Sequence, residues 1–404
     1  MLKAYKYRLY PTPDQTILLE KHFGITRLVY NLALECKSNA YKSNHVSLSR
    51  YDLQKQLIEL KDEFPWMKEI NSQSIQSSLL NLDNAYKKFF KEKKGFPKFK
   101  KKSSRNSFAV PQNIKIEKSK IIIPKFLEGI DYVMDRPIKG QIRSATISRT
   151  PTMKYFISIL CETGEIIPDK KLINPETSIG IDMGLKDFIV LSDGTKISNP
   201  KFHVNNEKTI KHLQKELSRK TKRSNRYNKA RIKLALQHEK INNQRNDFLH
   251  KLSTEITNRY DTICMEDLNV KDMIKNHHLS KAISDVSWSS FISMLEYKSK
   301  WKGKNLIKID RFDPSSKTCS ACGYIKHDLK LNDRKWICPE CGMLHDRDIN
   351  AAKNIKDFAI KNLLMGHQSM DVEASSMDDR LSKSLRPKKY LVNEALKIDL
   401  KNLP

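Results

Sequence analysis

The chain has 404 residues, and its 75 Lys and Arg against 46 Asp and Glu give a formal net charge of +29. This length predicts two or three domains, and a hydrophobic fraction of 39% is enough to form cores, which argues against wholesale disorder. The positive charge predicts a polyanionic partner, and the lack of a long apolar run or secretory signal predicts a soluble intracellular protein that binds nucleic acid, with no membrane partner.

The N-terminal region predicts one strand followed by a group of helices. Residues 3–9 alternate aromatic and basic side chains, as a half-buried strand does. Two prolines interrupt this pattern, and Thr12 with Gln15 predicts a capping box at a helix N-terminus. Leucines at helical spacing continue to about residue 92, so we expect a small helical domain after the strand.

A basic segment with interleaved aromatic rings follows at residues 87–105. It carries ten Lys and Arg but one acid, Glu92. Aromatic rings can stack on bases while Lys and Arg neutralise phosphates, so this segment is a candidate nucleic-acid contact. The alternative is a solvated basic loop with two anchoring aromatics. The candidate contact residues in it are Lys94, Phe96, Lys98 and Lys100.

Residues 107–165 predict a β-rich unit. Short runs of β-branched residues alternate there with turn-forming residues, which is typical of a small β-barrel or sheet. The strand predicted at residues 3–9 would join this unit, and the helical domain would then be an insertion. The runs are 114–116, 121–123, 145–147 and 155–161.

A long helical region follows, because residues 201–302 contain neither Gly nor Pro. Its first half, residues 201–251, has fifteen Lys and Arg against four acids, and its apolar spacing predicts two long helices that meet near residues 221–226. The charged face is either simply solvated or follows a phosphate backbone. The candidate contacts are Arg219, Lys222 and Arg223.

Four cysteines predict a zinc ribbon. Cys319, Cys322, Cys338 and Cys341 have the spacing C-x2-C-x15-C-x2-C, in which each pair forms one knuckle of a tetrahedral Zn²⁺ site. A glycine follows the second cysteine of each pair, where a knuckle often needs one. A closed four-thiolate site is structural, and the other three cysteines, Cys36, Cys161 and Cys264, fit the core.

Three carboxylates predict a second metal site. Asp182 and Glu266 each end a predicted buried strand, and Asp348 lies near the start of a predicted helix. Each alone could be structural, but together they are what a two-metal nuclease needs, with Mg²⁺ ions about 4 Å apart. The possible substitutes are Asp187, Asp267 and, most seriously, Asp346.

Two other chemistries fit the sequence less well. His277 and His278 could belong to a His–metal nuclease, but no matching Asn/His frame surrounds them. The sequence contains no P-loop, which argues against an ATP-driven helicase.

Several segments resemble a known family. The opening KAYKYRLYPT, the basic GFPKFKKKSSRNSF, the acidic GIDMGLKDF and MEDLNV, and the ribbon pieces SSKTCSACG and CPECGMLHDRDINAAKNI closely resemble TnpB, the nuclease of small insertion-sequence transposons. The chain is similar, more distantly, to compact type V CRISPR effectors. The resemblance covers residues 1 to about 362, and its most specific part is the ribbon followed by HDRDINAAKNI.

The resemblance implies an α+β multidomain fold. Its nuclease domain is RNase H-like (RuvC) with an inserted zinc ribbon, preceded by a wedge-type β-barrel that holds a helical recognition domain. The implied boundaries are 1–11 and 106–175 for the barrel, 12–105 for the recognition domain, 176–312 and 343–362 for the nuclease domain, 313–342 for the ribbon, and 363–404 for a C-terminal tail without an assigned role.

The resemblance also implies residue roles. Asp182, Glu266 and Asp348 would be the catalytic triad and would hold Mg²⁺, with two ions expected, while Arg347 and Asn350 would orient the site. Asp348 is preferred to Asp346 because the family's carboxylate lies two residues before the Asn. Further candidate nucleic-acid contacts are Lys3, Arg8 and Arg27.

The implied function is RNA-guided cleavage of double-stranded DNA beside a short transposon-adjacent motif, with a guide RNA from the transposon end. The protein would act as a monomer or dimer on its RNA, in a prokaryotic cytoplasm and at the nucleoid when bound to DNA. Two alternatives stay open: a non-cleaving regulator of transposition, and an unguided RuvC-type nuclease specific for branched DNA. A carboxylate is present at all three triad positions, which argues against a non-cleaving regulator. The additional helical and β-rich domains argue against an unguided nuclease, which would have little use for them.

Overall fold

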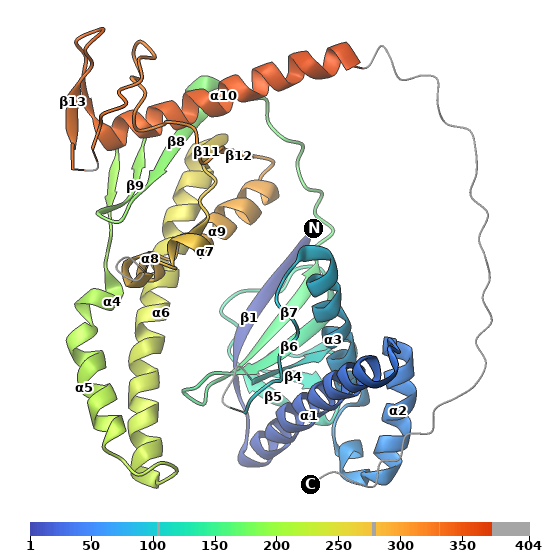
Figure 1. Cartoon of the computed structure of the whole chain (residues 1–404). Helices are drawn as coiled ribbons and strands as arrows, with labels where there is room; N and C mark the ends of the chain where they lie inside the picture. The colour runs from blue at the N-terminus through green and yellow to red at the C-terminus, as the bar shows by residue number, and fades with distance from the viewer. Residues whose placement is uncertain (103–105, 277–279, 331, 374–404) are drawn as a thin grey trace.

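The first sheet forms around the N-terminal strand. In the computed structural model, which describes residues 1–102, 106–276, 280–330 and 332–373, β1 (Leu2–Tyr10) lies between β7 (Tyr155–Glu162) and β5 (Phe126–Tyr132), antiparallel to both (Figure 1). The complete order is β2-β6-β7-β1-β5-β4-β3, where the other strands are β2 (Asn106–Val110), β3 (Lys115–Ile116), β4 (Lys120–Ile123) and β6 (Gln141–Arg149). The strands predicted in residues 107–165 and at 3–9 are thus present and belong to one sheet.

The N-terminal helices lie between β1 and β2 in the chain, so they are an insertion into this sheet. The predicted capping box is confirmed, because Thr12 accepts from the backbone N–H of Gln15 while the Gln15 side chain accepts from that of Thr12. Buried leucines, isoleucines and other apolar side chains from all of these helices form the core of this group. Its elements are α1 (Pro13–Asn44), α2 (Arg50–Glu63), η1 (Pro65–Glu69) and α3 (Ser72–Glu92).

The second sheet has the order β10-β9-β8-β11-β12. Three strands form an antiparallel meander, and β11 and β12 run parallel to β8. Parallel strands need crossover connections, which helices supply here. The strands are β8 (Ser178–Met183), β9 (Asp187–Leu191), β10 (Lys196–Ser198), β11 (Thr262–Glu266) and β12 (Asn305–Ile309).

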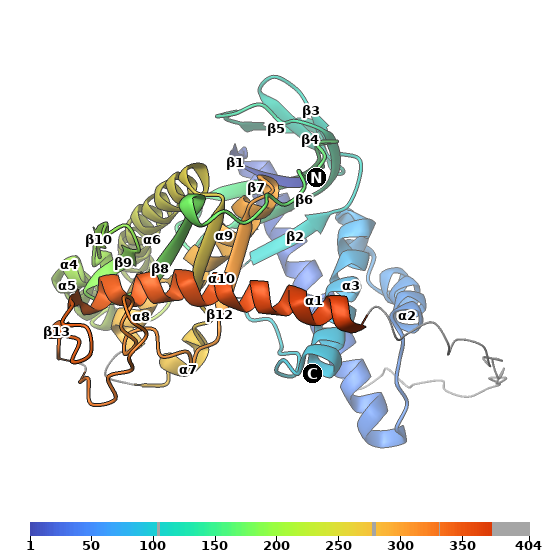
Figure 2. The same cartoon turned by 90° about the horizontal axis from the view of Figure 1, so that it is seen from above.

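Helices cover both faces of the second sheet. Ile263 and Met265 of β11 point toward α6 (Asn225–Arg259) and α9 (Trp288–Trp301), whereas Cys264 between them packs under α10 (Arg347–Glu373). This alternation is the period-2 pattern of a strand. Figure 2 shows α10 crossing the sheet from one side to the other. Even-numbered residues of β8 and β11 therefore share the α10 face.

A helical hairpin extends from the second sheet, as predicted for residues 201–251 (Figure 1). It consists of α5 (Glu207–Ser218) and α6, whose N-terminus is capped by the Ser224 side chain. The short helices α4 (Phe202–Asn205), α7 (Val270–Met273) and α8 (Ser280–Val286) and the turn η2 (Pro175–Thr177) complete this part. None of the helices in the described part of the chain has the length and apolar character that a membrane crossing requires.

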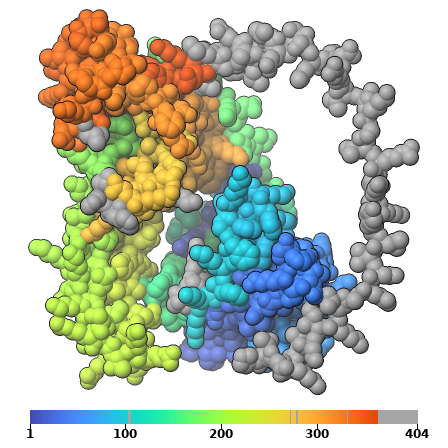
Figure 3. All heavy atoms as spheres, viewed as in Figure 1, coloured from blue at the N-terminus to red at the C-terminus, as the bar shows by residue number. Residues whose placement is uncertain are grey.

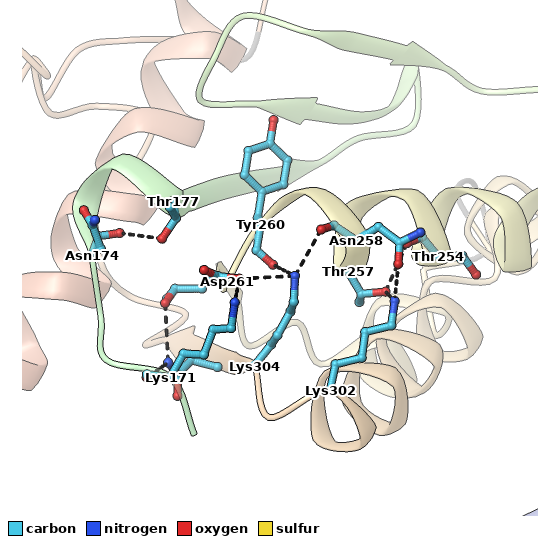
Figure 4. A network of polar contacts seen from close by, with 12 residues as sticks. Lys171, Asn174, Thr177, Thr254, Thr257, Asn258, Tyr260, Asp261, Lys302 and Lys304 are labelled. Atoms are coloured by element: carbon cyan, nitrogen blue, oxygen red, sulfur yellow. Dashed lines mark hydrogen bonds and ion pairs between the residues drawn. The ribbon is translucent and has the colours of Figure 1, made fainter. Parts of the chain in front are cut away.

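Polar side chains attach the segment between the two sheets to the second sheet (Figure 4). Lys171 pairs with Asp261 (Nζ to Oδ1 2.9 Å), and its backbone N–H donates to the carbonyl of Gly303 at 2.9 Å. Lys304 donates to the carbonyl of Tyr260 at 2.8 Å. The two bonds of Lys171 hold the linker against the residues that follow α6 and α9, and the bond of Lys304 joins these two connections to each other.

Candidate active site and zinc-binding ribbon

The four predicted cysteines lie together. Their sulfur atoms all lie within 4.8 Å of one another, with Sγ to Sγ distances of 3.6 Å for Cys319–Cys341 and for Cys322–Cys338. Four thiols at this spacing match the donor set of a structural Zn²⁺ site. The cluster could therefore hold zinc, as the spacing predicted.

The two knuckles repeat one hydrogen-bond pattern. The N–H of Cys319 donates to Tyr324 O (2.8 Å) and that of Cys338 to Met343 O (3.0 Å), and each following glycine donates back to the first cysteine at 2.9 Å. Both glycines have positive φ, +83° at Gly323 and +70° at Gly342, a conformation that residues with a Cβ rarely adopt. The ribbon also contains the strand pair β13 (Lys335–Ile337) and β14 (Leu344–Asp346).

His345 contacts this cluster from outside, a contact that was not anticipated from the sequence. Its Nε2 lies 3.0 Å from the Sγ of Cys319, and its ring packs on Trp336 with centroids 4.6 Å apart. Burial, with a smaller contribution from Lys353, lowers the pKa of His345, which favours the neutral ring. Its place in a strand directly after the second knuckle was the available signal.

Asp182 and Glu266 lie at the carboxyl ends of neighbouring parallel strands, Asp182 as the penultimate residue of β8 and Glu266 as the last residue of β11. The register pairs Met265 with Ile181, so the next pair along is Glu266 with Asp182. Adjacent parallel strands lie about 4.8 Å apart, and paired residues point to the same face. Both carboxylates therefore lie at one edge of the sheet, on its α10 face, as the two strand ends predicted.

Asp348 reaches the same edge because α10 lies unusually close to β8. A Cβ built on Gly180 would lie 1.9 Å from the carbonyl oxygen of Ala352, and Ala351 and Ala352 are both buried. Only glycine permits this contact. Asp348 is in the first turn of α10, where the helix dipole also stabilises a negatively charged carboxylate.

The electrostatics show that the three carboxylates interact. Burial, followed by the charges of Glu266 and Asp348, raises the pKa of Asp182 to about 7, and Arg347 and Arg334 oppose this rise. Such an accumulation of negative charge favours a divalent cation. Within the described residues, only the cysteines form a metal-ligating set within 4.8 Å, so the carboxylate oxygens do not converge that closely. Arg334 instead lies 3.5 Å from Asp348 (Nη1 to Oδ2).

The alternative carboxylates differ from Asp348 in position or in their partners. Asp346 pairs with Lys196 at 2.7 Å (Oδ2 to Nζ), and its Oδ1 accepts from the N–H of Ile349 at 3.2 Å, which caps α10. Asp187 begins β9, outside the pair of strand ends. Asp267 lies one residue beyond the end of β11. These contacts favour Asp348 over Asp346. His277 and His278 lie outside the described residues.

Two buried asparagines of α10 contact the ribbon. Asn350 donates to Thr318 O (2.7 Å) and accepts from the N–H of Ser320 (2.9 Å). Asn354 donates to Ser315 O (2.7 Å) and to Thr318 O (2.6 Å). Asn350 thus orients the ribbon, whereas the role of Asn354 was missed, although its spacing of four residues places it on the same helix face.

The candidate nucleic-acid contacts form no single site. Lys3 pairs with Glu165 at 2.7 Å, and Arg8 lies over the ring of Tyr10, both on β1, while Arg27 is on α1. At the hairpin tip, three cations are exposed on the turn between α5 and α6: Arg219, Lys222 and Arg223.

The aromatics and lysines after α3 are partly docked. Phe96 packs on Phe89 with centroids 5.4 Å apart, and Lys100 lies 3.9 Å above the Tyr30 ring. Lys94 pairs with Glu92 at 2.6 Å, and Lys98 is exposed. These contacts agree partly with the alternative of an anchored basic loop. Figure 3 shows a recess between the N-terminal helices and the α5–α6 hairpin.

The fold and the site define a class of α+β protein in which a four-cysteine ribbon precedes a carboxylate-bearing helix. Three protein-family models match the chain: a helix-turn-helix domain of IS605 OrfB proteins over residues 1–45, the IS605 OrfB "Probable transposase" over 158–277, and a "Cas12f1-like, TNB domain" over 288–355.

Relatives match over nearly the whole chain. A Streptomyces pristinaespiralis protein described as "Putative RNA-guided DNA endonuclease" is 36% identical over 395 residues, which cover 96% of each chain. The similarly described InsQ of Escherichia coli K12 is 31% identical, covering 88% of this chain and 91% of InsQ. The solved mini-RNA-guided endonuclease CRISPR-Cas_phi3 matches with a TM-score of 0.46 and 10% identity, over 89% of this chain and 92% of that one. The chain belongs to the TnpB (IS605 OrfB) family.

Proposed function

We propose that this chain is a transposon-encoded, RNA-guided endonuclease that cuts double-stranded DNA. Its active site would consist of Asp182, Glu266 and Asp348. The observation that carries the proposal is the placement of these carboxylates at one sheet edge, two by strand register and one by α10. The full-length similarity to relatives described as RNA-guided DNA endonucleases supports the same function.

The fold supports finer assignments. The five-stranded sheet with helices on both faces supports an RNase H-like, RuvC-type nuclease domain into which the zinc ribbon is inserted. The seven-stranded antiparallel sheet supports a wedge-type β-barrel, and the inserted helices support a recognition domain. Under this proposal, α10 continues the nuclease domain to Glu373, past the boundary expected at residue 362. Residues 374–404 of the expected tail lie outside the described part.

Asp182, Glu266 and Asp348 would hold Mg²⁺, which would activate the attacking water and stabilise the leaving oxygen. The carboxylates supply hard oxygen ligands, as Mg²⁺ prefers. Arg334 and Arg347 lie beside them and lower the local negative charge in the absence of other cations. The four cysteines would hold Zn²⁺, which orders the ribbon and leaves no open position for water.

The partners we propose are a guide RNA and its DNA target. Base pairing would supply sequence discrimination, while the protein holds the heteroduplex through its backbone. The formal charge of +29, and the exposed cations Arg219, Lys222 and Arg223 at the hairpin tip, suit backbone contacts.

The first test is to express the gene with its native downstream DNA and sequence the RNA that copurifies with the protein. A discrete RNA that overlaps the 3′ end of the gene supports the proposal, whereas heterogeneous or no RNA contradicts guidance. With that RNA, the wild type should linearise a matched plasmid in Mg²⁺ and Asp182→Ala should not. Cleavage that survives RNase treatment would support an unguided nuclease, and binding without cleavage would support a regulator.

A further inference from the structure

Ser315 connects the zinc ribbon to a carboxylate of the proposed active site. Its hydroxyl donates a hydrogen bond to Oε1 of Glu266 at 2.6 Å, and Ser315 is only 5% exposed. We propose that Ser315 is a positioning residue for Glu266 and that it makes the metal affinity of the carboxylate site depend on the zinc ribbon. This inference rests on the proposed function, because it assumes that Glu266 is a metal ligand.

Glu266 needs such a partner because of its position. It is the last residue of β11 and borders a shallow hollow of about 520 Å³ that Ser315 also lines. A glutamate has three side-chain torsions, and ordering them costs free energy each time a cation binds. A short, charge-assisted bond to one oxygen restricts those torsions in advance and leaves the other oxygen available as a ligand.

Ser315 is itself held from α10. Its carbonyl accepts from the amide of Asn354, which is 3% exposed and also donates to the carbonyl of Thr318. Asn350, 1% exposed, donates to the same carbonyl and accepts from the N–H of Ser320. Buried amides with these bonds satisfied hold the segment 315–320 in one position.

The same segment contains the first zinc ligand. Cys319 lies between Thr318 and Ser320, the two residues that Asn350 contacts. Zinc bound at Cys319 would therefore immobilise one end of the segment whose other end holds Glu266. Since α10 also carries Asp348, one network orients carboxylates from β11 and from α10 together.

The test compares metal binding in two hydroxyl deletions from this turn. Ser315→Ala removes the bond to Glu266, whereas Thr318→Val removes a buried hydroxyl that donates to Pro314 O at 2.8 Å and not to a carboxylate. Mn²⁺ binding to the RNA-loaded proteins is measured by EPR, together with zinc content and melting temperature. We expect Ser315→Ala to retain zinc but bind Mn²⁺ about tenfold more weakly, and Thr318→Val to stay within about twofold of wild type.

Cleavage supplies a second readout. The Mg²⁺ concentration for half-maximal cleavage should rise about tenfold in Ser315→Ala, and excess Mg²⁺ should restore most of the rate, as expected for a change in metal affinity. Unchanged Mn²⁺ affinity in Ser315→Ala overturns the inference. If the alanine variant loses zinc, Ser315→Thr is used instead, because it keeps the hydroxyl and should bind Mn²⁺ as the wild type does. A threonine variant that contains zinc but binds Mn²⁺ more weakly also overturns the inference.

The link to zinc is tested with a double-mutant cycle. Cys341→Ser should weaken Mn²⁺ binding at least as much as Ser315→Ala, and combining the two should add nothing, because both act on one connection. Additive effects overturn the link.

Asp182→Ala separates this inference from the function it rests on. A wild type that binds Mn²⁺ no better than Asp182→Ala contradicts the proposed active site. If the wild type binds Mn²⁺ more tightly than Asp182→Ala but with the same affinity as Ser315→Ala, the proposed active site stands and only the role of Ser315 is wrong.

Discussion

Asp182 illustrates at the scale of one residue how the site favours a cation. Its carboxyl is removed from water and faces two further carboxylates, and these effects raise its pKa to about 7. Without a cation, the group is partly protonated at neutral pH. A divalent ion binds the charged form, so it must displace this proton.

This pKa predicts the pH dependence of metal binding. The proton is bound below about pH 7 and lost above it, so Mg²⁺ affinity should fall as the pH drops through 7, by up to about tenfold per unit. Isothermal titration of the RNA-loaded protein between pH 6 and 8 measures this dependence. Asp182→Asn should remove it, and an affinity that is flat with pH in the wild type would contradict the assignment.

The two aspartates at the start of α10 should behave differently on substitution. Asp348→Ala should reduce the cleavage rate by on the order of a hundredfold or more, because it removes a proposed metal ligand. Asp346→Ala should instead destabilise the protein by about 1 kcal/mol, because it removes a helix cap and a partly exposed ion pair. Cleavage rates and denaturant unfolding distinguish them, and the opposite pattern would make Asp346 the ligand.

At the scale of elements, the site depends on how closely α10 approaches β8. Gly180 allows the backbone of α10 to reach the strand, and the buried alanines of α10 keep side chains out of this contact. The position of Asp348 relative to Asp182 is therefore set by a glycine that has no chemical role.

Gly180→Ala should displace α10. Its Cβ would meet the Ala352 carbonyl at 1.9 Å, so we expect a loss of about 1–3 kcal/mol in the free energy of unfolding and a large loss of cleavage. Gly24→Ala, in α1, is the matched control, because its Cβ would meet nothing within 4 Å and should be neutral or stabilising by up to about 1 kcal/mol. Wild-type cleavage by Gly180→Ala would show that the close approach is dispensable.

The ribbon should contain one zinc per chain. Elemental analysis of the purified protein checks this, and Cys338→Ser should abolish zinc retention because it removes one of four ligands. Cys264→Ser is the control: Cys264 is buried under α10, so it should lose stability but keep the metal. Zinc retained by Cys338→Ser would contradict the four-cysteine site.

At the scale of the whole molecule, the N-terminal helices and the α5–α6 hairpin border one recess (Figure 3), and both carry many Lys and Arg residues. The hairpin tip projects away from the second sheet and exposes its cations, while the lysines after α3 are partly docked on aromatic rings. Such a distribution suits contacts along a phosphate backbone more than recognition of individual bases.

Binding of the guide complex to DNA should depend steeply on salt. If the protein neutralises on the order of 10 phosphates, the log–log slope should be about −9. Replacing Arg219, Lys222 and Arg223 by Ala should reduce the slope by up to about 3, whereas exchanging Arg and Lys among them should leave it unchanged. Filter binding at several salt concentrations measures this, and an unchanged slope in the alanine variant would exclude the hairpin tip as a contact.

The sequence predicted those features that depend on local spacing. The capping box at Thr12, the two hairpin helices and the two cysteine knuckles each follow from residues that are close in the sequence, whose geometry is decided by chain connectivity. The pairing of the two knuckles, 16 to 22 positions apart, was predicted from the cysteine spacing. The strand ends at Asp182 and Glu266 were predictable for the same reason. Their roles, and those of the nucleic-acid contacts, stay predictions.

Tertiary structure decided which distant groups meet. The bond from Ser315 to Glu266, the anchoring of the ribbon by Asn354 and the contact of His345 with Cys319 join residues 49, 39 and 26 positions apart. No local periodicity encodes such contacts, because they depend on how sheet, helix and ribbon pack. The sequence by itself therefore determined which residue types were proposed as ligands and which elements carry them, and the packing of α10 determined how those side chains are placed.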